Sequence, residues 1–202
     1  LTVIVIGDIT WSDLFRVTII PVYVMVVSNL VNMHSGYNGL QAGLSIIVIS
    51  TLLVKSWMDG ILNAIIPGGA FLGAMVAFWW FNRYPSRVFE GNIGALLFGS
   101  VIGGIIVIQQ YWWFGFFILI PHIRNFLLWI AWLVMMQSHP REYLEEDGRH
   151  AKFGGTRDGV LHVPNRLTLK WIPNYYWRLN EKQSVWVAYG TSICFCILGI
   201  LL

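Results

Sequence analysis

The sequence predicts an all-α integral membrane protein, a multi-pass bundle of transmembrane helices with one polar excursion. Three observations lead to this prediction. The 202 residues are 56% hydrophobic and only 11% charged, whereas soluble domains are about 25% charged. Apolar segments long enough to cross a bilayer recur along the chain. Residues 138–183 are instead rich in charge and lack hydrophobic periodicity.

The apolar segments define the expected organisation. We expect spans at residues 17–33, 39–55, 61–81, 93–110, 111–137 and 184–202. The segment 111–137 contains Pro121, so it is either one bent span or a re-entrant piece followed by a span. Because the chain begins with the apolar residues 1–7, we expect it to be the C-terminal part of a longer protein. Three regions follow: transmembrane helices with the loops of a site (1–137), a cytoplasmic excursion (138–183) and a final transmembrane helix (184–202).

The basic residues predict which side of the membrane the loops occupy. If the spans alternate in direction, the turn at 35–38, the loop at 82–92 and the excursion all lie on one face. Most of the Lys and Arg residues fall in these stretches. Since cytoplasmic loops of membrane proteins carry an excess of Lys and Arg, we expect this face to be cytoplasmic.

A run of Asn and Gly residues interrupts the apolar sequence at 29–43 and is the strongest candidate for a site. Polar groups are costly in lipid and usually face a cavity there. Amide oxygens near many cations could bind a metal–phosphate complex, because hard cations take oxygen ligands and phosphates take Arg and Lys. We interpret Asn29 as a helix-packing or capping amide and His34 as a solvated or interfacial side chain.

The excursion contains two turn signals, Gly154-Gly155 and Asp158-Gly159. The second is typical of a β-hairpin. Residues 160–163 then form a short strand, and we expect a small β-hairpin near the mouth of the site.

Two motifs carry a resemblance to a known family. The pattern NxxNxxxGxNGLxAG at 29–43 resembles the Asn-rich signature of the polyprenyl-phosphate N-acetylhexosamine-1-phosphate transferases, of the glycosyltransferase family 4 type. YPSRVFEGN at 84–92 is similar to the next motif of that family, and HVPNR at 162–166 resembles a later basic motif more loosely. The branch most similar is the dolichyl-phosphate GlcNAc-phosphotransferase with its archaeal relatives.

The resemblance implies an activity. Members move a sugar-1-phosphate, here most simply GlcNAc-1-phosphate, from a UDP-sugar to a polyprenyl or dolichyl phosphate and release UMP. They work at the cytoplasmic leaflet with Mg²⁺, and Mn²⁺ is an open alternative. Such a phosphotransferase would make the first lipid-linked sugar of N-glycosylation or of a surface glycan.

The resemblance also implies metal ligands. Asn32 matches the metal-ligating Asn of the family, and Asn92 stands where better-studied members have a metal-ligating Asp. The exchange removes one negative charge, for which Glu90 is a candidate substitute. The adjacent Asp pair of the family is absent from these 202 residues, and we expect it on a preceding part of the protein.

Substrate roles follow in the same way. Gly36, Asn38 and Phe89 match positions around the uracil, while Arg87 is either an interfacial anchor or a phosphate contact. The basic motif assigns the pyrophosphate and sugar to His162 and Arg166. His139 and Arg141 are rivals for that role.

Alternatives remain at this level. The protein could use a different sugar, could be a transporter whose interrupted helix binds substrate at midplane, or could be an inactive or partial subunit that needs a partner chain. We expect membrane lipid and no nucleic acid among its partners, and leave a homodimer open.

Overall fold

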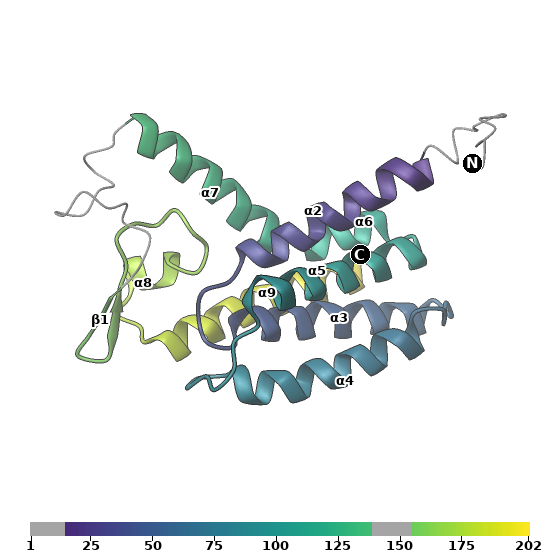
Figure 1. Ribbon diagram of the computed structural model, residues 1–202, viewed down its shortest axis with the longest axis horizontal. Helices are drawn as coiled ribbons and strands as arrows, with labels where there is room; N and C mark the ends of the chain where they lie inside the picture. The colour runs from purple at the N-terminus through teal and green to yellow at the C-terminus, as the bar shows by residue number, and fades with distance from the viewer. Residues whose placement is uncertain (1–14, 139–154) are drawn as a thin grey trace, which may run out of the picture.

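The computed structural model describes residues 15–138 and 155–202, which form helices and one two-stranded sheet (Figure 1). In chain order, the described elements are a short π-helix η1 (Phe15–Ile19), α2 (Ile20–Met33), α3 (Leu40–Met58), α4 (Ile65–Asn82), α5 (Gly91–Gln109), α6 (Trp112–Ile118), α7 (Ile120–Ser138), β1 (Gly155–Arg157), β2 (Val160–His162), α8 (Ile172–Tyr176) and α9 (Glu181–Leu201). His139 and Arg141 lie outside the described residues.

The helices confirm the predicted all-α membrane architecture. Within the described part of the chain, five segments are long and apolar enough to cross a bilayer: Arg16–Met33, α3, α4, α5 and α9. The helices α6 and α7 together make a sixth candidate, bent by 62° where they join. The predicted segment 111–137 is therefore broken, and Figure 1 shows α7 leaving the bundle at an angle.

Helix α3 lies at the centre and packs against α4, α5 and α9. Its side chains Val48, Ile49 and Leu52 are fully buried, and they share one apolar core with Ile102 and Ile106 of α5. Lipid tails are as apolar as these side chains, so the association of such helices depends on close packing and interhelical hydrogen bonds.

Small residues allow that close packing between α2 and α5. A Cβ atom at Gly103 would lie 3.2 Å from the Cα of Val24, and one at Gly99 would overlap the backbone of Ser28. The hydroxyls of Ser28 and Ser100 are 2.9 Å apart and hydrogen-bonded. Since Ser28 lies near residues 99 and 100 and Val24 near 103, the two helices run antiparallel.

A second close contact joins α3 to α9. A Cβ at Gly43 would overlap the ring of Tyr189. The Tyr189 hydroxyl donates to the carbonyl of Gly39 and accepts from Nε1 of Trp79 at 3.0 Å. The start of α3, the end of α4 and the first half of α9 are thus held together at one end of the bundle.

The predicted hairpin is also confirmed. Strands β1 and β2 pair antiparallel, with Gly155 opposite His162 and Arg157 opposite Val160. Asp158 and Gly159 both have positive φ in the connecting turn, which suits this dipeptide. The backbone N–H of Leu161 donates to Leu179 O at 2.9 Å and anchors the hairpin to the segment before α9.

Candidate active site

The 35–38 turn (Ser35–Asn38) connects α2 to α3 at the end of the bundle. Gly36 has φ +107° and Gly39 has φ +78°, backbone conformations that residues with a Cβ adopt only under strain. His34 precedes the turn and is only 1% exposed, so the prediction of a solvated or interfacial histidine was wrong. Its imidazole is enclosed because it packs against His122 of α7.

The loop between α4 and α5 lies beside this turn. A Cβ at Gly39 would come within 3.0 Å of the Cα of Arg83. Within the loop, the side-chain amide of Asn82 donates to Glu90 Oε2 and to Val88 O, both at 2.8 Å. Glu90, the candidate substitute for a missing carboxylate, is therefore already hydrogen-bonded inside its own loop.

Asn32 lies near the C-terminal end of α2 and Asn92 near the N-terminal end of α5. Asn32 follows Ser28 by four residues, and Asn92 precedes Ser100 by eight. Because Ser28 and Ser100 are in contact and the helices are antiparallel, both Asn residues lie toward the same end of the pair, about 6 Å apart along the axis at a rise of 1.5 Å per residue. Within the described residues, neither side-chain amide forms a hydrogen bond.

The side-chain oxygens of Asn32 and Asn92 are ligands of the type that a hard cation prefers. Oxygen is the ligand atom that Mg²⁺ takes in proteins. Within residues 15–138 and 155–202, however, no group of three or more His, Cys, Asp or Glu side chains could hold a metal ion. Asn32 and Asn92 therefore fit as part of a ligand set. Mg²⁺ usually completes its shell with water and substrate phosphates, so such a partial set is compatible with a site of this kind.

The substrate-binding candidates are spread around the turn. Asn38 lines a pocket of about 210 Å³ together with aromatic and cationic side chains. The other residues lining it are Trp79, Arg83, Tyr84, Lys182, Val185, Trp186 and Tyr189. Gly36 instead faces Lys170. Phe89 is 72% exposed, and Arg87 is also exposed, so both are open to a ligand approaching the loop from outside.

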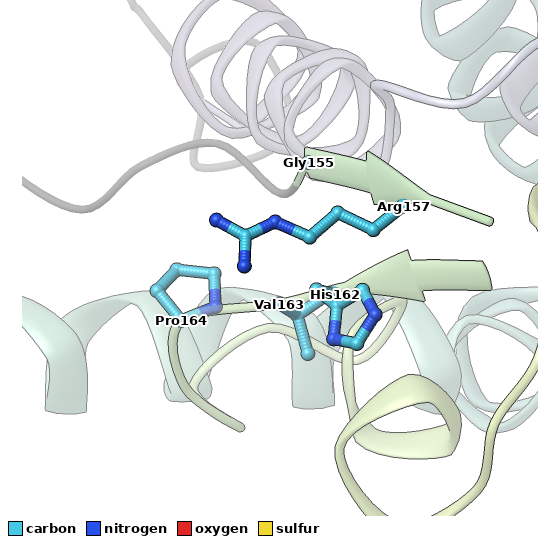
Figure 2. A pocket seen from close by; sticks show the side chains of 5 residues that line it. All are labelled: Gly155, Arg157, His162, Val163 and Pro164. Atoms are coloured by element: carbon cyan, nitrogen blue, oxygen red, sulfur yellow. The ribbon is translucent and has the colours of Figure 1, made fainter. Parts of the chain in front are cut away.

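A second cavity, of about 330 Å³, lies at the hairpin and is lined by His162 and Arg157 with Gly155, Val163 and Pro164. Figure 2 shows the Arg157 side chain extending from β1 across this space toward Pro164. Because the hairpin register pairs 155 with 162 and 157 with 160, Arg157 and His162 lie on the same face.

The structure separates the two residues of the predicted basic motif. Arg166 is exposed and its Nη1 donates to the Tyr176 hydroxyl at 2.7 Å. It is not among the residues that line the His162 cavity. Among the described residues, the cation that shares the cavity with His162 is Arg157, which no motif of the sequence singles out.

Sequence reasoning also missed the residues that hold the turn. Lys170 Nζ donates to Ser35 O at 2.7 Å, and Glu181 Oε1 accepts from the backbone N–H of Asn38 at 2.6 Å. Both belong to the polar segment that ends at α9, far from the turn in sequence. No periodicity or motif singles them out, because their role depends on how the segment folds back over the helices.

These features define a multi-pass membrane protein whose amide oxygens, loop glycines and cations gather at one end of a helix bundle. Residues 1–110 match the family described as glycosyl transferase family 4, and the chain belongs to this family.

Individual proteins similar to this chain are consistent with that family. The chain is 31% identical over 199 residues to a protein of Methanocaldococcus jannaschii provisionally named glycosyltransferase MJ1113, covering 96% of this chain and 62% of that protein. It is 30% identical to a Sulfolobus acidocaldarius protein provisionally named UDP-N-acetylglucosamine–dolichyl-phosphate N-acetylglucosaminephosphotransferase, covering 96% of this chain and 56% of that one. A phospho-N-acetylmuramoyl-pentapeptide-transferase of Enterococcus faecalis is 33% identical over 86 residues, 42% of this chain and 27% of its own length. The chain thus spans about three fifths of the archaeal relatives.

Proposed function

We propose that the full-length protein transfers a sugar-1-phosphate from a UDP-sugar to a polyprenyl or dolichyl phosphate and releases UMP. One observation carries the proposal: the 35–38 turn, the α4–α5 loop and the polar segment that leads into α9 meet at one end of the bundle. The turn touches the α4–α5 loop through Gly39 and Arg83, and it is hydrogen-bonded to the excursion through Ser35 and Asn38. The names of the archaeal relatives favour GlcNAc as the sugar.

In this reaction an oxygen of the lipid phosphate forms a bond to the sugar-bearing phosphorus of the UDP-sugar. The bond from that phosphorus to the bridging oxygen breaks, and UMP leaves with the electron pair. Little covalent chemistry is asked of the protein, so positioning and charge stabilisation supply most of the rate. A site at the end of the helices lets a lipid phosphate meet a water-soluble nucleotide. The concentration of Lys and Arg favours the cytoplasmic side for this end.

Asn32 and Asn92 are the proposed ligands of Mg²⁺. A bound Mg²⁺ would neutralise the pyrophosphate and withdraw charge from the departing UMP. The two amide oxygens hold no formal charge, so their role is to fix the position of the cation relative to the nucleotide. The remaining ligands are proposed to be substrate phosphates and water.

The nucleotide is proposed to bind over the 35–38 turn. Gly36 lets the base approach the backbone, Asn38 supplies amide hydrogen bonds, and exposed Phe89 can fold over the uracil. Arg87, exposed two residues before Phe89, is a contact for the uridine-linked phosphate. Cations there stabilise the phosphate charge that develops as the bond breaks.

His162 is the proposed contact for the pyrophosphate and sugar. The shared cavity supports Arg157 as its companion. Arg166 remains a proposed contact at the rim, but its bond to Tyr176 favours Arg157 for the inner position.

The test is UMP release by the full-length protein in detergent, with UDP-GlcNAc and a polyprenyl phosphate. We expect release that needs the lipid, is abolished by EDTA and falls at least 100-fold in Asn32→Ala. Asn29→Ala is the matched control, because Asn29 is exposed and its amide donates only to Met25 O in its own helix. Equal rates for Asn32→Ala and the wild type would contradict the assignment. Lack of any lipid-dependent release would contradict the function and would leave an inactive subunit as the better reading.

The structure gives no support to the transporter alternative. A transporter site is expected where a helix breaks near the bilayer midplane. Here the Asn-rich stretch lies where α2 ends at Met33 and α3 begins at Leu40. The interruption is therefore a connection at the end of two helices.

A further inference from the structure

We propose that Lys170 and Glu181 are positioning residues that hold the 35–38 turn in the conformation which receives uridine; this inference rests on the function proposed above. The two side chains act on opposite ends of the turn. The Lys170 ammonium donates to Ser35 O at 2.7 Å, and the Glu181 carboxylate accepts from the Asn38 N–H at 2.6 Å. We call these two contacts the turn clamp.

Both contacts of the turn clamp are charge-assisted hydrogen bonds. Such bonds are about twice as strong as neutral ones. The backbone between them includes Gly36, whose φ is +107°. Because glycine adopts positive and negative φ about equally well, the residue does not by itself fix the shape of the turn. A turn of this kind has no helix or strand to fix it, so its shape depends on contacts from outside.

The Lys170 ammonium is held at the turn by this hydrogen bond and by the aromatic rings around it. Its Nζ lies 5.4 Å from the centre of the Tyr37 ring and 5.9 Å from that of Trp171. In the described ranges 15–138 and 155–202, no carboxylate forms an ion pair with it. Its ammonium occupies the space that a Cβ at Gly36 would need. Position 36 therefore requires glycine for two reasons: the positive φ angle, and the lack of space for a Cβ beside the Lys170 ammonium.

Burial of this lysine has a measurable consequence. The surrounding protein lowers the pKa of Lys170 to about 8, because desolvation disfavours the charged form. At pH 7 the ammonium is retained, and above about pH 8 it is lost. The turn clamp should therefore weaken in mildly alkaline solution. Among the described titratable groups, His34 interacts electrostatically with Lys170 and Tyr37 with Glu181.

Glu181 reaches the turn from the first residue of α9. Asn180 caps this helix, since its Oδ1 accepts from the Gln183 N–H and its own N–H donates to Gln183 Oε1, both at 2.9 Å. The helix end is thus satisfied without Glu181. Its carboxylate is directed to Asn38 instead, so the contact is not a by-product of capping.

The elements that carry the two clamp residues are themselves fixed to the ends of the turn. The Asn125 amide donates to Met33 O at 3.0 Å and accepts from the Leu169 N–H at 2.9 Å. Asn125 therefore joins Met33, at the end of α2, to Leu169, the residue before Lys170. On the other side, Tyr189 of α9 donates to Gly39 O. Movement of the clamp residues away from the turn would break these bonds as well.

The test uses the full-length protein in detergent and compares Lys170→Met and Glu181→Gln with Lys170→Arg. We expect the first two variants to raise the Kd for UMP and the KM for the UDP-sugar about tenfold, with kcat changed less than threefold. Lys170→Arg keeps the charge and should stay within threefold of the wild type. Arg178→Met is the matched control, since Arg178 is an exposed cation of the same segment and should leave UMP affinity unchanged.

Three further measurements separate positioning from general damage to the fold. UMP affinity of the wild type should fall between pH 7.5 and 9, whereas Lys170→Arg should keep its affinity, because arginine stays charged. Hydrogen exchange of residues 34–40 should accelerate in Glu181→Gln. In the double variant Lys170→Met/Glu181→Gln, the loss of affinity should be less than the product of the single losses, since both contacts hold one turn.

The outcomes are distinguishable. Unchanged UMP affinity in Lys170→Met and Glu181→Gln, with active wild type, overturns the turn clamp and leaves the proposed function standing. If Lys170→Met does not fold, an alkaline loss of affinity that persists unchanged in Lys170→Arg overturns it. If the wild type neither binds UMP nor releases it from a UDP-sugar, the proposed function fails and the positioning role falls with it.

Discussion

The imidazoles of His34 and His122 meet edge to face inside the protein, with ring centroids 4.9 Å apart and both side chains 1% exposed. The contact joins the residue before the 35–38 turn to the bent helix α7. Within the described residues, both ring nitrogens of His34 lack a hydrogen-bond partner, and so does Nδ1 of His122. Burial lowers the pKa of His34 well below its usual value, and nearby His122 and Lys170 lower it further.

Replacing His34 by Leu should therefore not destabilise the protein. A buried polar atom without a partner costs about 1–3 kcal/mol, so His34→Leu should leave the free energy of unfolding unchanged or raise it. The pH dependence should also change. Below about pH 6.5 the unfolded chain binds a proton that buried His34 does not, so stability falls as the pH falls. The variant should lose less stability between pH 7 and 5 in detergent thermal melts. A large loss of stability at pH 7 would show that the imidazole has a partner that matters.

Restoring a carboxylate at Asn92 should strengthen metal binding. Asn92→Asp adds one negative charge beside the proposed cation, and we expect half-maximal UMP release at about a tenth of the Mg²⁺ concentration that the wild type needs. Asn92→Ala, which removes the oxygen, should need more Mg²⁺. The same Mg²⁺ dependence in all three proteins would remove Asn92 from the ligand set.

Gly43 should not tolerate a methyl group. Gly43→Ala forces a Cβ into the Tyr189 ring, and overpacking of this kind costs about 1–3 kcal/mol. Adding Tyr189→Ala should cost less in the Gly43→Ala background than in the wild type, because the clash is then relieved. Gly104→Ala is the control, since nothing lies within 4 Å of its Cβ position. Equal melting temperatures for Gly43→Ala and Gly104→Ala would contradict the packing described.

Arg157 should matter more than Arg166 for turnover. Arg157 shares a cavity with His162, so Arg157→Gln should lower kcat/KM for the UDP-sugar about 10- to 100-fold, the loss of one charged contact to phosphate. Arg166→Gln should cost less than tenfold, because its guanidinium is bonded to Tyr176 outside that cavity. Arg157→Lys should recover part of the loss. The reverse ranking would return the inner position to Arg166.

Much of the architecture was predictable from the sequence. Apolar segments of membrane length fix the helices, because a chain in lipid must satisfy its backbone within each segment. Asp158-Gly159 predicted the hairpin turn that joins β1 to β2. The bend at α6 and α7 was among the alternatives that Pro121 left open, and only the structure placed it at 62°.

The candidate site was predictable only in part. The motifs predict Asn32, Asn38 and His162 as site residues, because residue type and spacing are local features of the chain. Lys170 and Glu181 could not be found this way. Each is one charge among many in a polar segment, and its partner is a backbone atom about 140 residues earlier in the chain.

The sequence by itself therefore determined the class of protein, the order of its apolar segments and the motif residues, since hydropathy and spacing act locally. The tertiary structure decided which side chains reach the 35–38 turn, that His34 is buried, and that Arg157 accompanies His162. These depend on the way residues 155–181 fold back over the ends of α2 and α3. That arrangement is set by contacts between distant residues, such as the two hydrogen bonds of Asn125, and no local pattern encodes it.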